Sequence, residues 1–182
     1  HGKVNIFENE LDHSTTGNMF VARLNGTFME GLIEKNTLRG RKVSGNHCLG
    51  INNVNGAFII RYNTITDGET GINSNTESNQ IYYNQFIGND VAIIVQQDKS
   101  ANVMNNTFFN NENYAIESLS GSKVVSKNNI FYLTPISQKA CKFGGEFISD
   151  YNLFNVEKSG FLNDYSSLPV WSGSTGQDNN SL

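Results

Sequence analysis

The sequence Ile60-Arg-Tyr-Asn63-Thr-Ile65 decides the fold, because the same pattern recurs along the chain. It consists of an apolar residue, two variable residues, Asn, any residue and a second apolar residue. Further copies lie at Ile33–Leu38, Ile81–Phe86, Val103–Phe108 and Val125–Ile130, and Ile148–Leu153 repeats the pattern with Tyr151 in the Asn position. From Asn36 onward the position returns after 27, 21, 22, 22 and 23 residues. A fixed period of this length indicates a solenoid.

A second, shorter pattern keeps nearly the same phase. A small residue followed by Ile occurs at Gly50-Ile51, Gly71-Ile72, Ala92-Ile93 and Ala115-Ile116. Each repeat is too short for a pair of helices, and it is rich in β-branched and aromatic residues, which favour strands. The sequence therefore predicts an all-β fold, a parallel β-helix of about six coils of 21–27 residues. Neighbouring coils of such a fold lie about 4.8 Å apart.

The repeated Asn predicts a corner between strands. Asn tolerates the left-handed backbone conformation that a sharp corner requires. Stacked in register, each side-chain amide can also hydrogen-bond the Asn of the next coil. The chain carries 28 Asn among 182 residues, many of them at these corners. The first corner is assigned to Asn5, and residues 8–18 are expected to form a loop that leaves the coil.

Length and composition predict one domain of coils at residues 1–165. Within it, residues 1–32 are expected to form an irregular first coil with a loop. Residues 166–182 depart from the repeat, and the segment Ser166–Trp171 predicts a short helix that covers the last coil. The chain opens within the repeat pattern, and we expect it to be a piece of a longer protein. Cys48 and Cys141 fall four coils apart, about 19 Å at the coil spacing, so both are predicted to be free thiols.

The charge balance argues against a nucleic-acid partner, because the net charge is −4 with 13 Lys and Arg. No apolar run approaches the roughly 20 residues of a membrane-spanning helix, so no membrane insertion is expected. No metal-ligand spacing is recognisable, and the sequence indicates no particular cofactor. The oligomeric state is left open.

Two groups of residues are candidates for ligand binding. Residues 39–47 lengthen one coil and carry Arg39, Arg41 and Lys42, and insertions in solenoids often form binding loops. Polar residues one position beyond the repeated Ile should face outward on successive coils, where amides can bind sugar hydroxyls. The candidates are Asn52 and Asn73 in this row, which continues through Ile94 and Glu117, and Asn75 and Gln96, which lie two residues further along their strands. The alternative for both groups is a solvated surface.

Candidate catalytic residues are Asp67, Glu69, Glu117 and His47. Glycoside hydrolysis needs two carboxyl groups about 5–9.5 Å apart, and Asp67 and Glu117 lie two coils apart along the axis. A lyase needs a base beside a cation, which Arg41, Lys42 or His47 supplies. The alternative for Asp67-Gly68-Glu69 is a turn without chemistry.

With these repeats, the chain resembles the right-handed parallel β-helix proteins of the pectate lyase superfold over about residues 33–154. The ending from Ser167 to Ser181 is similar to a closing segment of many secreted microbial members. The resemblance implies an extracellular protein that acts on polysaccharides as a lyase, hydrolase or epimerase. Gly45-Asn46-His47-Cys48 lacks the Asp-Asp pair that precedes a Cys in polygalacturonase-like hydrolases. No catalytic residue of a family is therefore transferred.

The resulting prediction is a secreted β-helix protein, at the cell surface or outside the cell, that binds an extended polysaccharide. Cleavage by a lyase or glycoside hydrolase reaction is left open. The alternatives are a carbohydrate-binding module without catalysis and a structural module of an adhesin or fibre.

Overall fold

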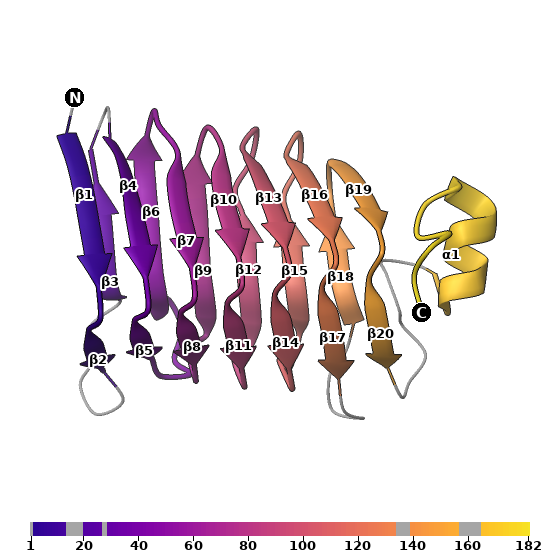
Figure 1. The fold of residues 1–182 in the computed structure, drawn as a ribbon, viewed down its shortest axis with the longest axis horizontal. Coiled ribbons are helices and arrows are strands. Elements are labelled where there is room, and N and C mark those ends of the chain that lie inside the picture. The colour runs from indigo at the N-terminus through magenta and orange to yellow at the C-terminus, as the bar shows by residue number, and fades with distance from the viewer. Residues whose placement is uncertain (1, 14–19, 27–28, 134–138, 157–164) are drawn as a thin grey trace.

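The computed structural model describes residues 2–13, 20–26, 29–133, 139–156 and 165–182. Its chain winds as a right-handed solenoid of three parallel sheets (Figure 1). Six complete coils of three strands are followed by two strands of a seventh. The all-β fold and the number of coils predicted from the repeats are confirmed.

The first sheet has the order β1-β4-β7-β10-β13-β16-β19, and the second has the order β2-β5-β8-β11-β14-β17-β20. The strands of the first sheet are β1 (Gly2–Phe7), β4 (Met29–Glu34), β7 (Phe58–Arg61), β10 (Asn79–Tyr82), β13 (Ser100–Met104), β16 (Lys123–Lys127) and β19 (Glu146–Asp150). Those of the second are β2 (Glu10–Asp12), β5 (Thr37–Arg39), β8 (Thr64–Thr66), β11 (Gln85–Ile87), β14 (Thr107–Phe109), β17 (Ile130–Leu133) and β20 (Leu153–Val156).

The third sheet contains six strands, each of which precedes the turn back to the first sheet. They are β3 (Phe20–Asn25), β6 (His47–Val54), β9 (Thr70–Thr76), β12 (Val91–Val95), β15 (Tyr114–Ser118) and β18 (Lys139–Phe143). Every pairing between strands is parallel, so that residues at the same phase of the repeat lie beside one another on successive coils.

The core is a column of side chains stacked along the solenoid axis. The rings of Phe86, Phe108, Phe131 and Phe154 stack in succession, with centroids 5.1, 4.9 and 4.8 Å apart. These spacings match the distance of about 4.8 Å between neighbouring strands, so each coil covers the apolar surface of the previous one. The interior is therefore narrow but continuous.

An asparagine ladder runs along the corner between the first and second sheets. Each side-chain amide donates to the Oδ1 atom of the next Asn over 2.9–3.1 Å. The same Oδ1 accepts the backbone N–H of the preceding Asn over 2.9–3.1 Å. The ladder that the sequence predicted is confirmed for four of its members. The complete set is Asn9, Asn36, Asn63, Asn84, Asn106, Asn129 and Asn152.

Three details of the predicted corner were wrong. Asn129 and Asn152 occupy the ladder position, not Asn128 and Tyr151, and Asn9 rather than Asn5 begins the ladder. The left-handed conformation belongs to the residue before each ladder Asn, with φ between 55° and 58° at Glu8, Lys35, Tyr62, Tyr83, Asn105, Asn128 and Tyr151. The corner therefore uses Asn for its hydrogen bonds, while residues of several types adopt the bent backbone.

The proposed loop over residues 8–18 was also wrong where the structure describes it, because Asn9 joins the ladder and β2 follows at Glu10–Asp12. Residues 14–18 of that prediction lie outside the described residues. The β2 segment therefore continues the first coil along the second sheet.

A second, shorter ladder stabilises the corner between the second and third sheets. Asn89 donates through Nδ2 to Asn111 Oδ1 over 3.1 Å, and the backbone N–H of Gly68 donates to Asn89 Oδ1 over 3.0 Å. The preceding residues, Asp67, Gly88 and Asn110, have φ of 59°, 64° and 52°. At both corners the left-handed residue is thus followed by a ladder position, which is Asn in each case except Gly68.

The C-terminal segment closes the solenoid. Helix α1 (Leu168–Thr175) lies beyond β19 and β20 at the end of the stack (Figure 1). Trp171, only 2% exposed, packs on Phe143 and Phe147, and its indole N–H donates to Asp178 Oδ2 over 2.8 Å. Asp178 Oδ1 in turn accepts the amide of Asn152 over 3.1 Å, so Asp178 ends the asparagine ladder. The predicted short helix is confirmed.

Candidate functional site

The outer face of the third sheet carries the row of side chains that the sequence singled out. Asn73 pairs with Ile94, and Ile94 pairs with Glu117, as predicted. The residue opposite Asn73 on the preceding coil is Gly50, because Leu49 rather than Ile51 aligns with Ile72. The row therefore runs Arg23, Gly50, Asn73, Ile94, Glu117 and Lys142.

Asn52 was placed in this row incorrectly. It lies opposite Asn25, two residues further along the strand than expected. In this coil the counterpart of the repeated pair Gly71-Ile72 is Cys48-Leu49. The pair Gly50-Ile51 has the same pattern but lies two residues later, and this produced the wrong assignment. Asn75 and Gln96 follow the register partners Ser74 and Val95, so they do form the neighbouring row.

Hydrogen bonds connect polar side chains of three successive coils on this face. Gln96 Nε2 donates to Asn73 Oδ1 over 2.9 Å, and Asn73 Nδ2 lies 3.4 Å from His47 Nε2. Because Oδ1 of Asn73 already accepts, its amide N–H group points to His47, whose Nε2 accepts in the neutral imidazole. Burial lowers the pKa of His47, against the opposing effect of Glu69, and nearby Arg23 lowers it further. The neutral ring and the two amides thus form one oriented chain.

Glu117 lies on the same face but in a separate ion pair. Its Oε1 accepts from Lys142 Nζ on the next coil over 2.7 Å, and the Glu117 side chain is only 14% exposed. The Lys142 ammonium also lies 5.3 Å from the centre of the Tyr114 ring. The hydrogen bond with Glu117 raises the pKa of Lys142. The ion pair therefore holds the Glu117 side chain in place on this face.

Asp67 is engaged elsewhere, at the corner that precedes the third sheet. Arg39 Nε donates to Asp67 Oδ2 over 3.1 Å, and both side chains are about half exposed. Asp67 and Glu117, proposed as a carboxyl pair, therefore have different cationic partners on different sheets. The structure does not bring them together as a pair.

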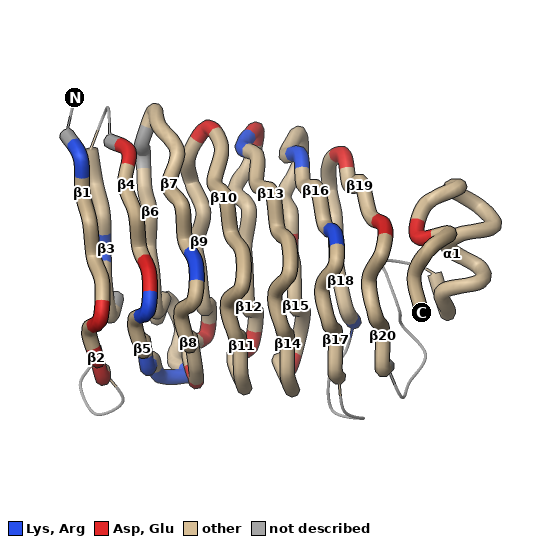
Figure 2. Tube along the Cα trace, viewed as in Figure 1, with Lys and Arg blue, Asp and Glu red and all other residues tan. Residues whose placement is uncertain are grey.

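The segment 40–46 folds back onto Glu69. The Glu69 carboxylate accepts the backbone N–H groups of Gly45 and Asn46, the latter over 3.2 Å. Asn46 Oδ1 also accepts the N–H of Arg41 over 3.2 Å. Figure 2 shows the cations of this segment grouped at the ends of β5 and β8. Glu69, predicted as catalytic, therefore fixes the shape of this basic loop.

Lys42 extends from this loop along the axis and donates to Glu112 two coils beyond Glu69. Asp90 lies on the coil between Glu69 and Glu112, because the next residue, Val91, pairs with Thr70 on one side and with Tyr114 on the other. Burial raises the pKa of Asp90, and the charge and hydrogen bond of Glu112 add to this effect. The hydrogen bond with Lys42 lowers the pKa of Glu112. The pKa values of the two carboxyl groups are therefore shifted in opposite directions.

Sequence reasoning missed Asp90, Glu112 and the partner cation Lys142. A signal for the first two was present, because Glu69, Asp90 and Glu112 recur at nearly the period of the coils. Lys142 follows the repeated pair Ala140-Cys141, whose Cys replaces the Ile of the earlier coils. That replacement concealed its place in the row.

Neither cysteine belongs to the site. Both are free and fully enclosed, as the coil arithmetic predicted. Burial raises the pKa of the Cys48 thiol to about 12 and also raises that of Cys141. A buried neutral thiol is a poor nucleophile. Among the described residues, no group of three or more His, Cys, Asp and Glu side chains is arranged to hold a metal ion.

Comparison with protein families supports the architecture. The family described as the right handed beta helix region matches residues 1–134. The chain belongs to this right-handed β-helix family. The searches of curated proteins and of solved structures found no match. Within the described part of the chain, no helix has the length and apolar character needed to cross a membrane.

Proposed function

We propose that this β-helix protein binds an extended polysaccharide along the outer face of the third sheet. The observation that carries the proposal is the hydrogen-bonded chain of His47, Asn73 and Gln96, which crosses three coils. Side-chain amides held in this way keep fixed orientations, so they bind hydroxyl groups with little loss of conformational entropy. Their spacing of about 4.8 Å per coil presents a regular series of polar groups to a linear ligand.

The groups around these three hydrogen-bonded side chains suit the same ligand. The basic loop with Arg41 and Lys42 borders the face at one side, and the Glu117–Lys142 pair with Tyr114 lies further along it. Acceptors, donors and an aromatic ring thus lie on one surface. A polymer bound outside the coils also fits a protein secreted from the cell, which is the location that we propose.

The test is a binding assay with a panel of neutral and uronic-acid polysaccharides, using affinity electrophoresis and calorimetry. The double variant Asn73→Ala with Gln96→Ala is expected to weaken binding by about tenfold or more, since it removes both fixed amides. The matched control is Asn102→Ala, which removes a half-buried amide from the outer face of the first sheet. Equal binding by the double variant and the wild type would reject this face as the binding surface.

Cleavage of the bound polymer is a second candidate function. The observation that favours it is the set of titratable groups beside the face, in which Asp90 and Glu112 have pKa values shifted in opposite directions. Such a difference separates an acid from a base. The test is to look for new reducing ends and for unsaturated products with wild-type protein and with Asp90→Asn. Binding without any product from the whole panel would leave a carbohydrate-binding module, and neither binding nor product would favour a structural module.

A further inference from the structure

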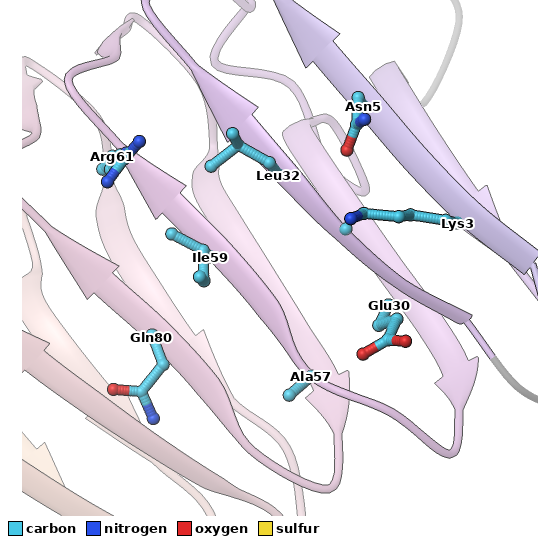
Figure 3. A pocket seen from close by; sticks show the side chains of 9 residues that line it. Lys3, Asn5, Glu30, Leu32, Ala57, Ile59, Arg61 and Gln80 are labelled. Carbon is cyan, nitrogen blue, oxygen red and sulfur yellow. The ribbon is translucent and has the colours of Figure 1, made fainter.

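A groove lies on the outer face of the first sheet, on a different sheet from the proposed polysaccharide face. It has a volume of about 510 Å³ and spans four strands from β1 to β10 (Figure 3). At the spacing of the coils it is about 14 Å long. This volume lies within the range of about 300–1,000 Å³ that is typical of small-ligand sites.

The floor of the groove is a row of outward side chains from successive coils. Register places Asn5 beside Leu32, Leu32 beside Ile59 and Ile59 beside Gln80. Two apolar residues are thus bounded along the axis by two amides. Ile59 is 39% exposed, so the middle of the floor presents apolar surface to solvent.

The sides of the groove supply charged and polar groups. Lys3 and Glu30 are register partners on one side, and the next coil has the small Ala57 there. Arg61 closes the other side, where its Nε donates to Glu34 Oε2 over 2.7 Å. Each of the two cations therefore lies beside a carboxylate on a neighbouring strand, and the wall has little net charge.

We propose that this groove binds a short, uncharged oligosaccharide, separately from the polysaccharide face of the third sheet. A pyranose ring has an apolar face of C–H groups and a rim of hydroxyls that both donate and accept hydrogen bonds. Leu32 and Ile59 match the apolar face, while Asn5, Gln80 and Glu30 match the rim. Amides both donate and accept, so they suit hydroxyl groups.

The charge distribution excludes the other obvious occupants. A uronate or sulfated sugar would need a cation without a carboxylate beside it, and both Lys3 and Arg61 have one. A fatty acid would need a longer apolar floor than two side chains, with a polar group at one end only. The amides at both ends of the floor do not fit a fatty acid.

The experiment is an NMR titration of the full chain with cellotetraose, xylotetraose and mannotetraose, beside tetragalacturonate and decanoate. At least one uncharged sugar is expected to shift the backbone signals of Leu32, Ile59 and Gln80. Ile59→Asp is expected to weaken this binding by about tenfold or more, because it places a charge on the apolar floor. The matched control is Val125→Asp, which changes the same outward row beyond the groove.

The outcomes separate this site from the polysaccharide face. The double variant at Asn73 and Gln96 is expected to keep the shifts in the groove, whatever happens on the third sheet. Shifts caused only by tetragalacturonate or only by decanoate would overturn the proposal, as would no shift at Leu32 and Ile59 with any sugar. Equal weakening by Ile59→Asp and Val125→Asp would overturn it as well.

Discussion

Replacing the ladder residue Asn106 by Leu tests the physical basis of the fold. The Asn106 side chain makes five hydrogen bonds, to Asn84 N and Nδ2, to the carbonyls of Ile81 and Met104, and to Asn129 Oδ1, over 2.8–3.1 Å. The residue is 1% exposed, so water does not replace these partners without local opening. The substitution therefore removes an entire rung from the middle of the ladder.

The expected loss follows from the buried groups that remain. A buried donor or acceptor without a partner costs about 1–3 kcal/mol. The N–H of Asn84 and two backbone carbonyls lose the amide, and the apolar Leu side chain offsets part of this cost. We expect a decrease of about 3–5 kcal/mol in the free energy of unfolding. For a chain of this size, that corresponds to a melting temperature lower by roughly 6–20 °C.

Thermal and denaturant unfolding would be measured for Asn106→Leu and for two controls. Asn102→Leu changes a half-buried outward Asn of the same coil, and the change in stability should remain within about 0.5 kcal/mol. Asn9→Leu removes the exposed first rung, whose bonds exchange readily with water, and should lie between the two. A loss at Asn106 no greater than at Asn102 would refute the role of the ladder. Polysaccharide binding should survive in all three variants.

Two further variants test other parts of the structure. Asp90→Asn should raise the free energy of unfolding at neutral pH, because the pKa of Asp90 is raised in the folded state and its ionisation costs stability as the pH rises through that pKa. The gain from the substitution should vanish at a pH below the usual carboxyl range. Denaturant titrations at several pH values would show this dependence. Trp171→Ala should lower the free energy of unfolding by about 3–5 kcal/mol, because it removes the contact between α1 and the last coil. Val170→Ala, on the exposed side of the helix, should change the free energy of unfolding little. Equal losses of stability in calorimetry would contradict the capping role.

Part of the site followed from the sequence, because parallel coils place residues of equal phase beside one another. Asn73 and Gln96 lie on the outer face as predicted, and they hydrogen-bond each other. Asn52 was misplaced because Gly50-Ile51 imitates the repeated pair within one irregular coil. Glu117 was correctly placed in its row, but its partner Lys142 lies in a coil in which Cys141 replaces the repeated Ile.

The sequence by itself determined the architecture, since a period of 21–27 residues with one apolar phase permits stacked coils and little else. From Asn36 onward it also located the asparagine corner to within one residue, although it assigned the bent backbone to the ladder Asn itself and not to the residue before it. Tertiary structure decided which charges meet. Lys42 reaches Glu112 across coils and Arg39 pairs with Asp67, because long side chains choose partners by direction and reach, which sequence spacing does not record.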